Sequence, residues 1–380
     1  MSSKLPESKI ACGGLILLDQ ISETNSPDLS ADDGNELDIT FALAQACFSK
    51  NDWEGVCNHL KRAIELSPED PSCHLFYAHS LFSLGDISAS IRHFDLAISF
   101  EKNPQSIEDL KKQLFSTPHI ALRGFFQGSH APERAIFMSA AVDLIKNRPA
   151  PFNFLEIGSY AGSSLLTWSN AAENFLAGEC HIVCVDPWGE SGADLYNPTM
   201  KKNLESDRAY EVFCHNASLS RENVRVTPIR GSSHDILPTF KNNTFDLIYI
   251  DGSHQYADVL SDIVESAKLL KNGGIICGDD LELQLFQCDQ EFVENNKTAD
   301  FIKETKSGES FHPGVTLAVA EYFGDVSNFA GFWVMRKISD GFEKVSFSNA
   351  TGLRPPIWPW EFHERITAYF EDSDELGRLL

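Results

Sequence analysis

The sequence predicts an α/β protein, in which helices flank a mostly parallel sheet of seven strands and an all-helical domain precedes the sheet. Short apolar runs alternate with helix-like stretches after Pro149, and glycine-bearing turns or acidic residues follow several of those runs. Apolar and small residues also recur at a fixed interval in the first third of the chain. Alternating strands and helices are typical of a parallel sheet with crossover helices, whereas a fixed interval is typical of helical repeats.

Residues 1–36 mix Ser, Pro, Asp, Asn and Gly, and we expect a flexible N-terminal arm there. Residues 37–104 carry the recurring interval of 34 residues. The pairs that it relates are Leu43 and Tyr77, Cys47 and Leu81, Asp52 and Asp86, Leu60 and Phe94, Ala63 and Ala97, and Ile64 and Ile98. This pattern resembles two tetratricopeptide repeats, in which small residues let paired helices approach closely. The repeats would either dock a protein partner or a second copy, or brace the fold.

Residues 105–148 are interpreted as capping and linking helices. Two repeats bury little surface alone, so we expect either a helix over 107–115 or the sheet domain to cap them. A second helix, over 131–146, leads into the sheet. The sheet domain is assigned to 149–340, with strands at 154–157, 181–185, 224–229, 245–250, 274–277 and 331–336. Residues 341–380 read as an irregular apolar wrap followed by a last helix.

The charge balance excludes some classes of partner. The formal net charge is −24, and no run of Lys and Arg interrupts it, so we expect neither nucleic acid nor a membrane as partner. The nine cysteines are scattered without a CxxC pair or regular spacing, so neither a disulfide framework nor a zinc site is suggested. No targeting or spanning segment is visible, and we expect a cytoplasmic protein.

A glycine-bearing turn follows the first predicted strand. Gly158 and Gly162 stand between that strand and a helix, where backbone can come close to a cofactor. Their spacing differs from the Gly-x-Gly-x-x-Gly of dinucleotide-binding loops, which disfavours a nicotinamide cofactor. Asp186 ends the second strand, where an acid either accepts the hydroxyls of a ribose or caps a helix.

Three further blocks follow the third, fourth and fifth strands: 230–236, 245–254 and 269–280. In this order the blocks resemble those of class I S-adenosylmethionine (SAM)-dependent methyltransferases, which have a Rossmann-like sheet. More closely they resemble the metal-dependent O-methyltransferases that act on catechols, macrolide sugars and aminocoumarin sugars. The resemblance covers about 149–338, and the ordered set is more specific than any one block.

The resemblance implies a role for each matching position. It assigns cofactor binding to Glu156, Gly158, Ser159, Tyr160, Gly162, Ser163, Asp186, Trp188, Ser233, His234 and Asp251. Among these, Glu156 and the glycines would line the methionine side, Asp186 would hold the ribose, and Ser233 and His234 would contact the adenine.

Three acids match metal-ligand positions: Asp251, Asp279 and Asp280. The catechol enzyme has Asn where Asp280 stands. Hard carboxylate oxygens suit Mg²⁺, although acids at strand ends also cap the helices that follow them. His254 stands three residues after Asp251, where related enzymes place a base, and both are assigned to catalysis. A turn histidine is the alternative for His254, and also for His234.

These assignments predict a methyl transfer from SAM to a hydroxyl of a small molecule with Mg²⁺ assistance. A cation held at the strand ends can bind two neighbouring hydroxyls, which fits a sugar or catechol-like diol such as a natural product. The polar insertion 281–311 would lie over the acceptor as a lid, or be an ordinary surface loop. Two alternatives are a natural-product hydroxylase of the same fold group and a non-catalytic adaptor that binds through its repeats.

Overall fold

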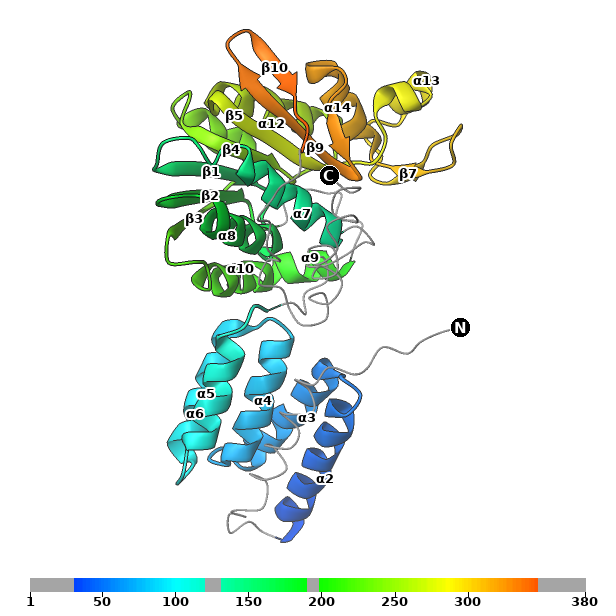
Figure 1. Cartoon of the computed structure of the whole chain (residues 1–380). Coiled ribbons are helices and arrows are strands. Elements are labelled where there is room, and N and C mark those ends of the chain that lie inside the picture. Colours follow the sequence, from blue (N-terminus) through cyan, green and yellow to red (C-terminus); the bar gives the residue numbers. More distant parts are fainter. Residues whose placement is uncertain (1–30, 120–130, 190–197, 348–380) are drawn as a thin grey trace, which may run out of the picture. The chain divides into compact units, whose positions relative to one another are not determined.

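A computed structural model describes residues 31–119, 131–189 and 198–347 of the chain. By contacts between backbone segments the chain divides into two compact units, residues 1–122 and 123–380. The first unit is helical and the second contains the sheet, as Figure 1 shows. None of the helices in the described ranges is long and apolar enough to cross a bilayer.

The helical unit consists of successive helices that pack against their neighbours in the chain. The helices are α2 (Ala31–Phe48), α3 (Trp53–Leu66), α4 (Pro71–Ser83), α5 (Ile87–Phe100) and α6 (Gln105–Phe115). The 34-residue interval is reproduced in the caps: Asp52 accepts a hydrogen bond from Gly55 N and Asp86 accepts one from Ala89 N. An N-cap aspartate satisfies a backbone amide that the first helical turn leaves free. Pairing of helices at this interval is therefore confirmed, and their assignment to the tetratricopeptide class stays a prediction.

Apolar residues that lie 34 positions apart are buried to a similar degree, except for those on the first helix. Ala63 and Ala97 are fully buried where paired helices meet. Leu43 is 47% exposed, whereas its repeat equivalent Tyr77 is buried. Leu43 lies on α2, the first helix of the described stack, while Tyr77 lies on a helix that has neighbours on both sides. Leu43 and Tyr77 therefore occupy equivalent positions of the interval, but only Tyr77 is packed between helices.

The structure differs from the predicted domain boundaries at both ends of the chain. Helix α2 begins at Ala31, so 31–36 are helical rather than part of an arm, and residues 1–30 lie outside the described residues. At the other end, 341–344 form a strand of the sheet rather than a wrap, and the expected last helix lies outside the described residues.

The second unit contains a mixed sheet in which five adjacent strands are parallel. Its seven-strand path runs in the order β10, β9, β5, β4, β1, β2, β3, and β8 pairs with β9 as an eighth strand. The strands are β1 (Phe152–Ile157), β2 (Cys180–Asp186), β3 (Val224–Arg230), β4 (Phe245–Ile250), β5 (Leu270–Leu281), β8 (Ser327–Phe329), β9 (Gly331–Ile338) and β10 (Gly341–Lys344). The predicted Rossmann-like sheet is confirmed, and the short strand β8 is an addition to it.

Helices cover both faces of the sheet, because successive strand residues point to opposite sides. In β1, Phe154 packs in the core beneath α7 (Ala131–Asp143), α8 (Ser163–Phe175) and α10 (Arg208–Ser218). The neighbouring Leu155 packs in the core beneath α12 (Tyr256–Leu269) and α14 (Pro313–Phe323). Figure 1 shows α7 and α8 on one side of the sheet and α12 and α14 on the other.

Three shorter helices complete the described elements of this unit outside the insertion. They are α9 (Pro198–Glu205), α11 (Ser233–Ile236) and the 3-10 turn η1 (Leu237–Thr239). Helix α11 follows β3 directly, so it begins at the edge of the sheet where the parallel strands end.

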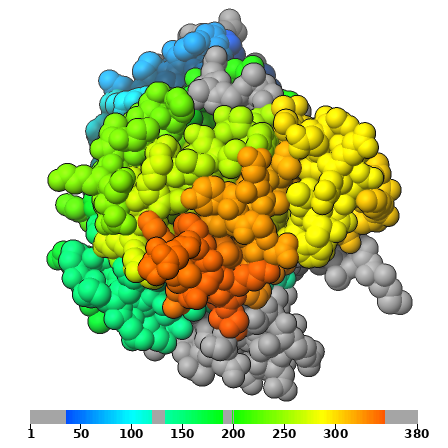
Figure 2. Space-filling view, turned by 90° about the horizontal axis from the view of Figure 1, so that it is seen from above, coloured from blue at the N-terminus to red at the C-terminus, as the bar shows by residue number. Residues whose placement is uncertain are grey.

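The insertion after β5 folds as a small structure with its own apolar centre. It contains η2 (Leu285–Gln287), α13 (Gln290–Asn295) and a two-stranded sheet of β6 (Ile302–Lys303) and β7 (Ser310–Phe311). Buried Leu283, Val293 and Phe311 pack together with Leu317 of α14. The space-filling view shows this segment, in yellow, as a lobe beside the orange C-terminal strands (Figure 2). Its position as a substrate lid stays a prediction.

Candidate functional site

The carboxyl ends of the parallel strands bring the predicted site residues to one edge of the sheet. The turn after β1 begins at Gly158, whose φ of +83° is a left-handed backbone conformation. A Cβ atom at Gly158 would lie 2.1 Å from the backbone oxygen of Asp251, at the end of β4. Glycine therefore lets the turns after two adjacent strands touch, which places Glu156 and Asp251 in one site.

Gly158→Ala should destabilise the domain strongly. The substitution forces an L-residue into a left-handed conformation and drives its methyl group into backbone, for a combined cost of about 2–5 kcal/mol. Gly252→Ala is the matched control, because the nearest atom to its Cβ would be 3.5 Å away in ordinary contact and no unusual φ is required. Urea unfolding of both variants measures the difference. Equal stability of the two variants would contradict the close approach of the turns.

Asp186, at the end of β2, holds the glycine-bearing turn in place. Its Oδ2 accepts hydrogen bonds from the backbone amides of Ser159 and Tyr160, both at 2.9 Å, and its Oδ1 accepts one from Trp188 N at 2.6 Å. Burial raises the pKa of Asp186, and the three amides oppose that rise. One acceptor position remains on Oδ1, so the predicted contact with a ribose has room for one donor beside this structural role.

Glu156 is the best candidate to bind a cationic group of a cofactor. Its side chain is buried, and Ser159 Oγ donates a 2.6 Å hydrogen bond to Oε2. Its Oε1 is also buried and has no hydrogen-bond partner among the described residues. Burial raises the pKa of Glu156, and the nearby side chains of Ser159, Ser164 and Cys184 oppose that rise. A buried carboxylate oxygen without a partner is costly, and an ammonium group would satisfy it. The amino group of the SAM methionine fits this requirement.

The remaining predicted cofactor residues have mixed surroundings. Trp188 is buried beneath the turn, where its indole N–H donates to the backbone oxygen of Tyr160 at 2.7 Å, so it supports the turn from below. Tyr160 OH accepts from Asn203 Nδ2 at 3.1 Å. Gly162 precedes helix α8 with a φ of +82°, and Ser163 begins that helix.

Ser233 and His234 begin α11, after β3. His234 is exposed at the strand-end edge, and its backbone amide donates to Ser232 Oγ at 3.2 Å. Their predicted contact with an adenine stays a prediction.

Three carboxylates converge next to this turn. Ligand oxygens of Asp251, Asp279 and Asp280 lie within 4.8 Å of one another, and all three side chains are partly exposed. Burial and repulsion from Asp280 and Asp279 raise the pKa of Asp251 well above its ordinary value. Tyr249 OH donates to Asp251 Oδ2 at 3.0 Å. Mutual repulsion among hard oxygen donors is what a divalent cation such as Mg²⁺ would relieve, so the donor set fits that ion.

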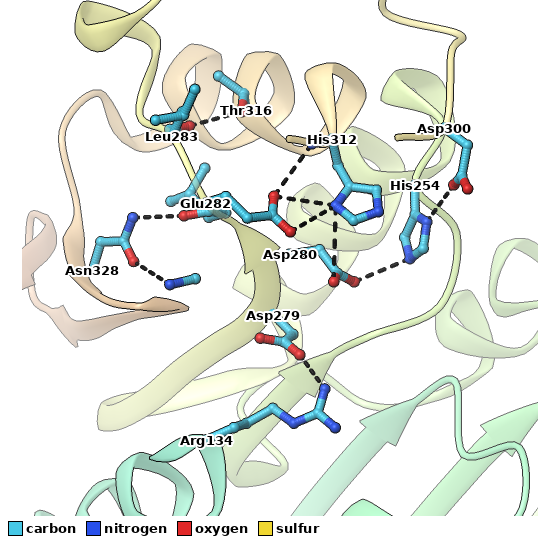
Figure 3. Close-up of polar contacts among 12 residues, drawn as sticks. Arg134, His254, Asp279, Asp280, Glu282, Leu283, Asp300, His312, Thr316 and Asn328 are labelled. Atoms are coloured by element: carbon cyan, nitrogen blue, oxygen red, sulfur yellow. Dashed lines mark hydrogen bonds and ion pairs between the residues drawn. The ribbon is translucent and has the colours of Figure 1, made fainter. Parts of the chain in front are cut away.

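A cation of the chain already stands beside this cluster. Arg134, on α7, donates to the carboxylate of Asp279 and forms an ion pair with it, as Figure 3 shows. Burial opposes the charge of Arg134, but attraction to Asp279 outweighs it and raises the arginine pKa. Arg134 therefore neutralises part of the negative charge, and a metal ion at Asp279 would share that carboxylate with the guanidinium.

His254 lies between two carboxylates. Its Nε2 is 3.0 Å from Asp280 Oδ2 and its Nδ1 is 2.6 Å from Asp300 Oδ1. Burial alone would lower the pKa of His254, but attraction to Asp280 and Asp300 outweighs it and raises the pKa to about 11. The metal-free chain thus holds His254 as an imidazolium at neutral pH. Burial alone would raise the pKa of Asp280, and attraction to His254 instead lowers it.

The raised pKa of His254 predicts that the stability of the metal-free protein depends on pH. A raised pKa means that the folded chain binds this proton more tightly than the unfolded chain, so its stabilisation is complete below about pH 6.5 and is lost as pH rises toward 11. His254→Gln should therefore lower the unfolding free energy more at pH 6 than at pH 9.5. Urea titrations in chelator measure both differences. An equal loss at the two pH values would contradict the double ion pair.

Sequence reasoning missed four residues of this site. Arg134, Glu282, Asp300 and His312 come from the helix before β1, the residue after β5, the insertion and the start of α14. Arg134 is the only cation in an otherwise apolar or acidic helix, which is a signal that could have drawn attention to it. Asp300 stands in a polar insertion where nothing distinguishes it from its neighbours.

Comparisons with known proteins agree with the strand-edge site. Residues 155–281 match the family model of a methyltransferase domain. The comparison with curated proteins gives no match. The matched range contains Glu156, the glycine-bearing turn, His254 and the three carboxylates.

Among solved structures, the chain is similar to a Corynebacterium glutamicum protein, with 16% identity over 66% of this chain and 97% of that one, and a TM-score of 0.36. It is also similar to CalS11, a TDP-rhamnose 3'-O-methyltransferase of calicheamicin biosynthesis, with 15% identity over 66% and 94% and a TM-score of 0.34. A third similar structure is the O-methyltransferase TomG from Streptomyces achromogenes, involved in tomaymycin synthesis and solved with SAM, with 17% identity over 56% and 82% and a TM-score of 0.33.

Proposed function

We propose that the chain transfers a methyl group from SAM to a hydroxyl of a small molecule, with Mg²⁺ at the carboxylate cluster, and the match of residues 155–281 to a methyltransferase family model supports this. One observation carries the proposal: the turn with the unpaired oxygen of Glu156 and the cluster of three carboxylates lie at adjacent strand ends. Cofactor and acceptor must meet there, because methyl transfer is an in-line displacement at the methyl carbon.

Each side chain has a role in this proposal. Glu156 binds the amino group of the cofactor, and Asp186 fixes the turn that faces it. Asp251, Asp279 and Asp280 would hold Mg²⁺, which when bound orients two neighbouring acceptor hydroxyls and lowers the pKa of one. His254 takes the hydroxyl proton at Nε2. Asp300 supports that role by accepting from Nδ1, which fixes the tautomer and directs Nε2 toward the cluster.

The insertion contributes to the acceptor side. Asp300 reaches His254, and the ring of the adjacent Phe301 lies 4.7 Å from the ring of His312 while 53% of the residue is exposed. An exposed aromatic ring next to the cluster is a surface on which a sugar or aromatic acceptor can stack. The insertion is therefore proposed to act as the acceptor lid.

The experiment follows labelled methyl from SAM into paired acceptors. A panel of catechols and sugar diols is compared, compound by compound, with the corresponding monomethyl ethers in the presence of Mg²⁺. Label should enter oxygen of at least one diol and not of its monomethyl ether, because two neighbouring hydroxyls are needed at the cation. Equal labelling of diols and ethers, or label recovered on nitrogen, would contradict the proposed reaction.

A further inference from the structure

A second group of metal-ligating side chains lies beside the carboxylate cluster. Ligand atoms of His254, Asp280 and His312 lie within 4.8 Å of one another, and the two imidazole rings are 4.3 Å apart between centroids. His254 comes from the turn after β4, Asp280 from β5, and His312 from the residue that precedes α14. Figure 3 shows both rings directed toward the carboxylate of Asp280.

Further carboxylates orient these imidazoles. Asp300 accepts from Nδ1 of His254 at 2.6 Å, which leaves Nε2 facing Asp280 at 3.0 Å. Glu282 lies 3.0 Å from Nδ1 of His312, and Asp280 lies 3.9 Å from the same nitrogen. Metal-bound histidines commonly have a carboxylate on the ring nitrogen that is not bound to the metal, as His254 has in Asp300.

The backbone holds the two histidines close together. Gly314, in the first turn of α14, is so near the turn after β4 that an added Cβ would lie 2.2 Å from the backbone oxygen of His254. The same Cβ would lie 2.8 Å from the backbone oxygen of Lys297, in the insertion. Three segments distant in sequence therefore meet without an intervening side chain, which fixes the spacing of His254 and His312.

We propose that His254, His312 and Asp280 form a binding site for a divalent cation of the zinc type, next to the carboxylate site proposed for Mg²⁺. Imidazole nitrogen favours ions such as Zn²⁺ and Co²⁺, whereas the carboxylates of Asp251 and Asp279 favour Mg²⁺. The two sites share Asp280. This inference concerns binding and stands whether or not methyl transfer occurs. An ion in this site would occupy Nε2 of His254, so that nitrogen could not accept a proton from a hydroxyl while the ion is bound.

Co²⁺ is the probe, because the position and intensity of its visible absorption depend on its ligands and on its coordination geometry. The full-length protein, freed of metal, is titrated with Co²⁺ alone, and the bound ion is then challenged with Zn²⁺ and with Mg²⁺. One Co²⁺ should bind with a visible spectrum, and Zn²⁺ but not Mg²⁺ should displace it. His312→Gln should weaken Co²⁺ binding by at least about tenfold, and Asp300→Asn by roughly 10- to 100-fold.

Two variants separate this site from its neighbours. Asp279→Asn changes the carboxylate site alone and should retain Co²⁺ binding. His181→Gln removes a histidine that bonds Thr227 on β3, away from the cluster, and should also retain it. Equal affinity of the parent and His312→Gln would overturn the proposal. So would loss of binding in Asp279→Asn but not in His312→Gln, or no Co²⁺ binding by the folded parent. If His312→Gln does not fold by circular dichroism, His254→Gln is expected to give the same loss.

Discussion

Replacing Asp279 with Asn should reduce methyl transfer by at least about 10³-fold and leave SAM affinity nearly unchanged, since a metal supplies several kcal/mol to the transition state. Asn preserves the shape of the side chain and its hydrogen bond with Arg134 but removes the anionic oxygen that would bind Mg²⁺. Excess chelator should have the same effect on the parent protein. Radiometric rates and SAM titrations measure the two quantities separately.

Asp258→Asn is the control for that experiment. Asp258 is an exposed acid on α12 that accepts a hydrogen bond from Ser253 and does not belong to the cluster. Arg134→Gln should have the opposite effect on the metal site. It removes the guanidinium that forms an ion pair with Asp279, so Mg²⁺ should bind more tightly. Full turnover of Asp279→Asn, or of the parent in chelator, would rule out a metal role.

His254→Gln should lower kcat by about 10²- to 10⁴-fold, which is the range for loss of a positioned general base. SAM affinity should not change, because Glu156 and the glycine-bearing turn remain intact. Asp300→Asn should lower kcat less, since it removes the group that orients His254 rather than the base itself. Steady-state kinetics of both variants at saturating SAM measure the order of the effects.

The surroundings of His254 make this prediction informative. In the metal-free chain the imidazole is paired with Asp280 and Asp300 and is protonated, so Nε2 must leave Asp280 and release its own proton before it can accept one from a hydroxyl. His181→Gln, which leaves the cluster intact, should retain the parent rate. A rate of His254→Gln within about threefold of the parent would lie below the range for a base and would assign His254 a structural role.

Much of the fold could be predicted because the sheet is encoded locally. Strand β4 was predicted with the observed bounds, since a run of six residues that is apolar except for Asp246 lies between polar turns. Strand β5 is longer than the predicted 274–277, because Leu270 already pairs with Phe245 of β4 and the strand continues through Gly273. Strands β8 and β10 are short and partly polar, so their own sequences do not mark them as strands. Each forms through antiparallel pairing with β9.

The candidate site could be predicted only in part for a similar reason. Asp251 directly follows β4 and Asp279 lies near the end of the adjacent parallel strand β5, and the ends of parallel strands share one edge of the sheet. Arg134 reaches that edge from α7, His312 from the residue before α14, and Asp300 from the insertion. Their approach depends on how those elements pack over the sheet, which no local pattern of residues records. The contribution of Trp188, beneath the turn, likewise becomes visible only in the packed structure.

Binding of labelled SAM to the parent protein and to Glu156→Gln tests the central claim most directly. The unpaired Oε1 of Glu156 should bind the cofactor amino group, and loss of a hydrogen bond between charged groups costs about 1.5–3 kcal/mol, or roughly 10- to 150-fold in affinity. Equilibrium dialysis should therefore show one SAM per chain in the parent and in Asp279→Asn, and a loss of this size in Glu156→Gln. No binding by the folded parent, or unchanged affinity in Glu156→Gln, would contradict the account.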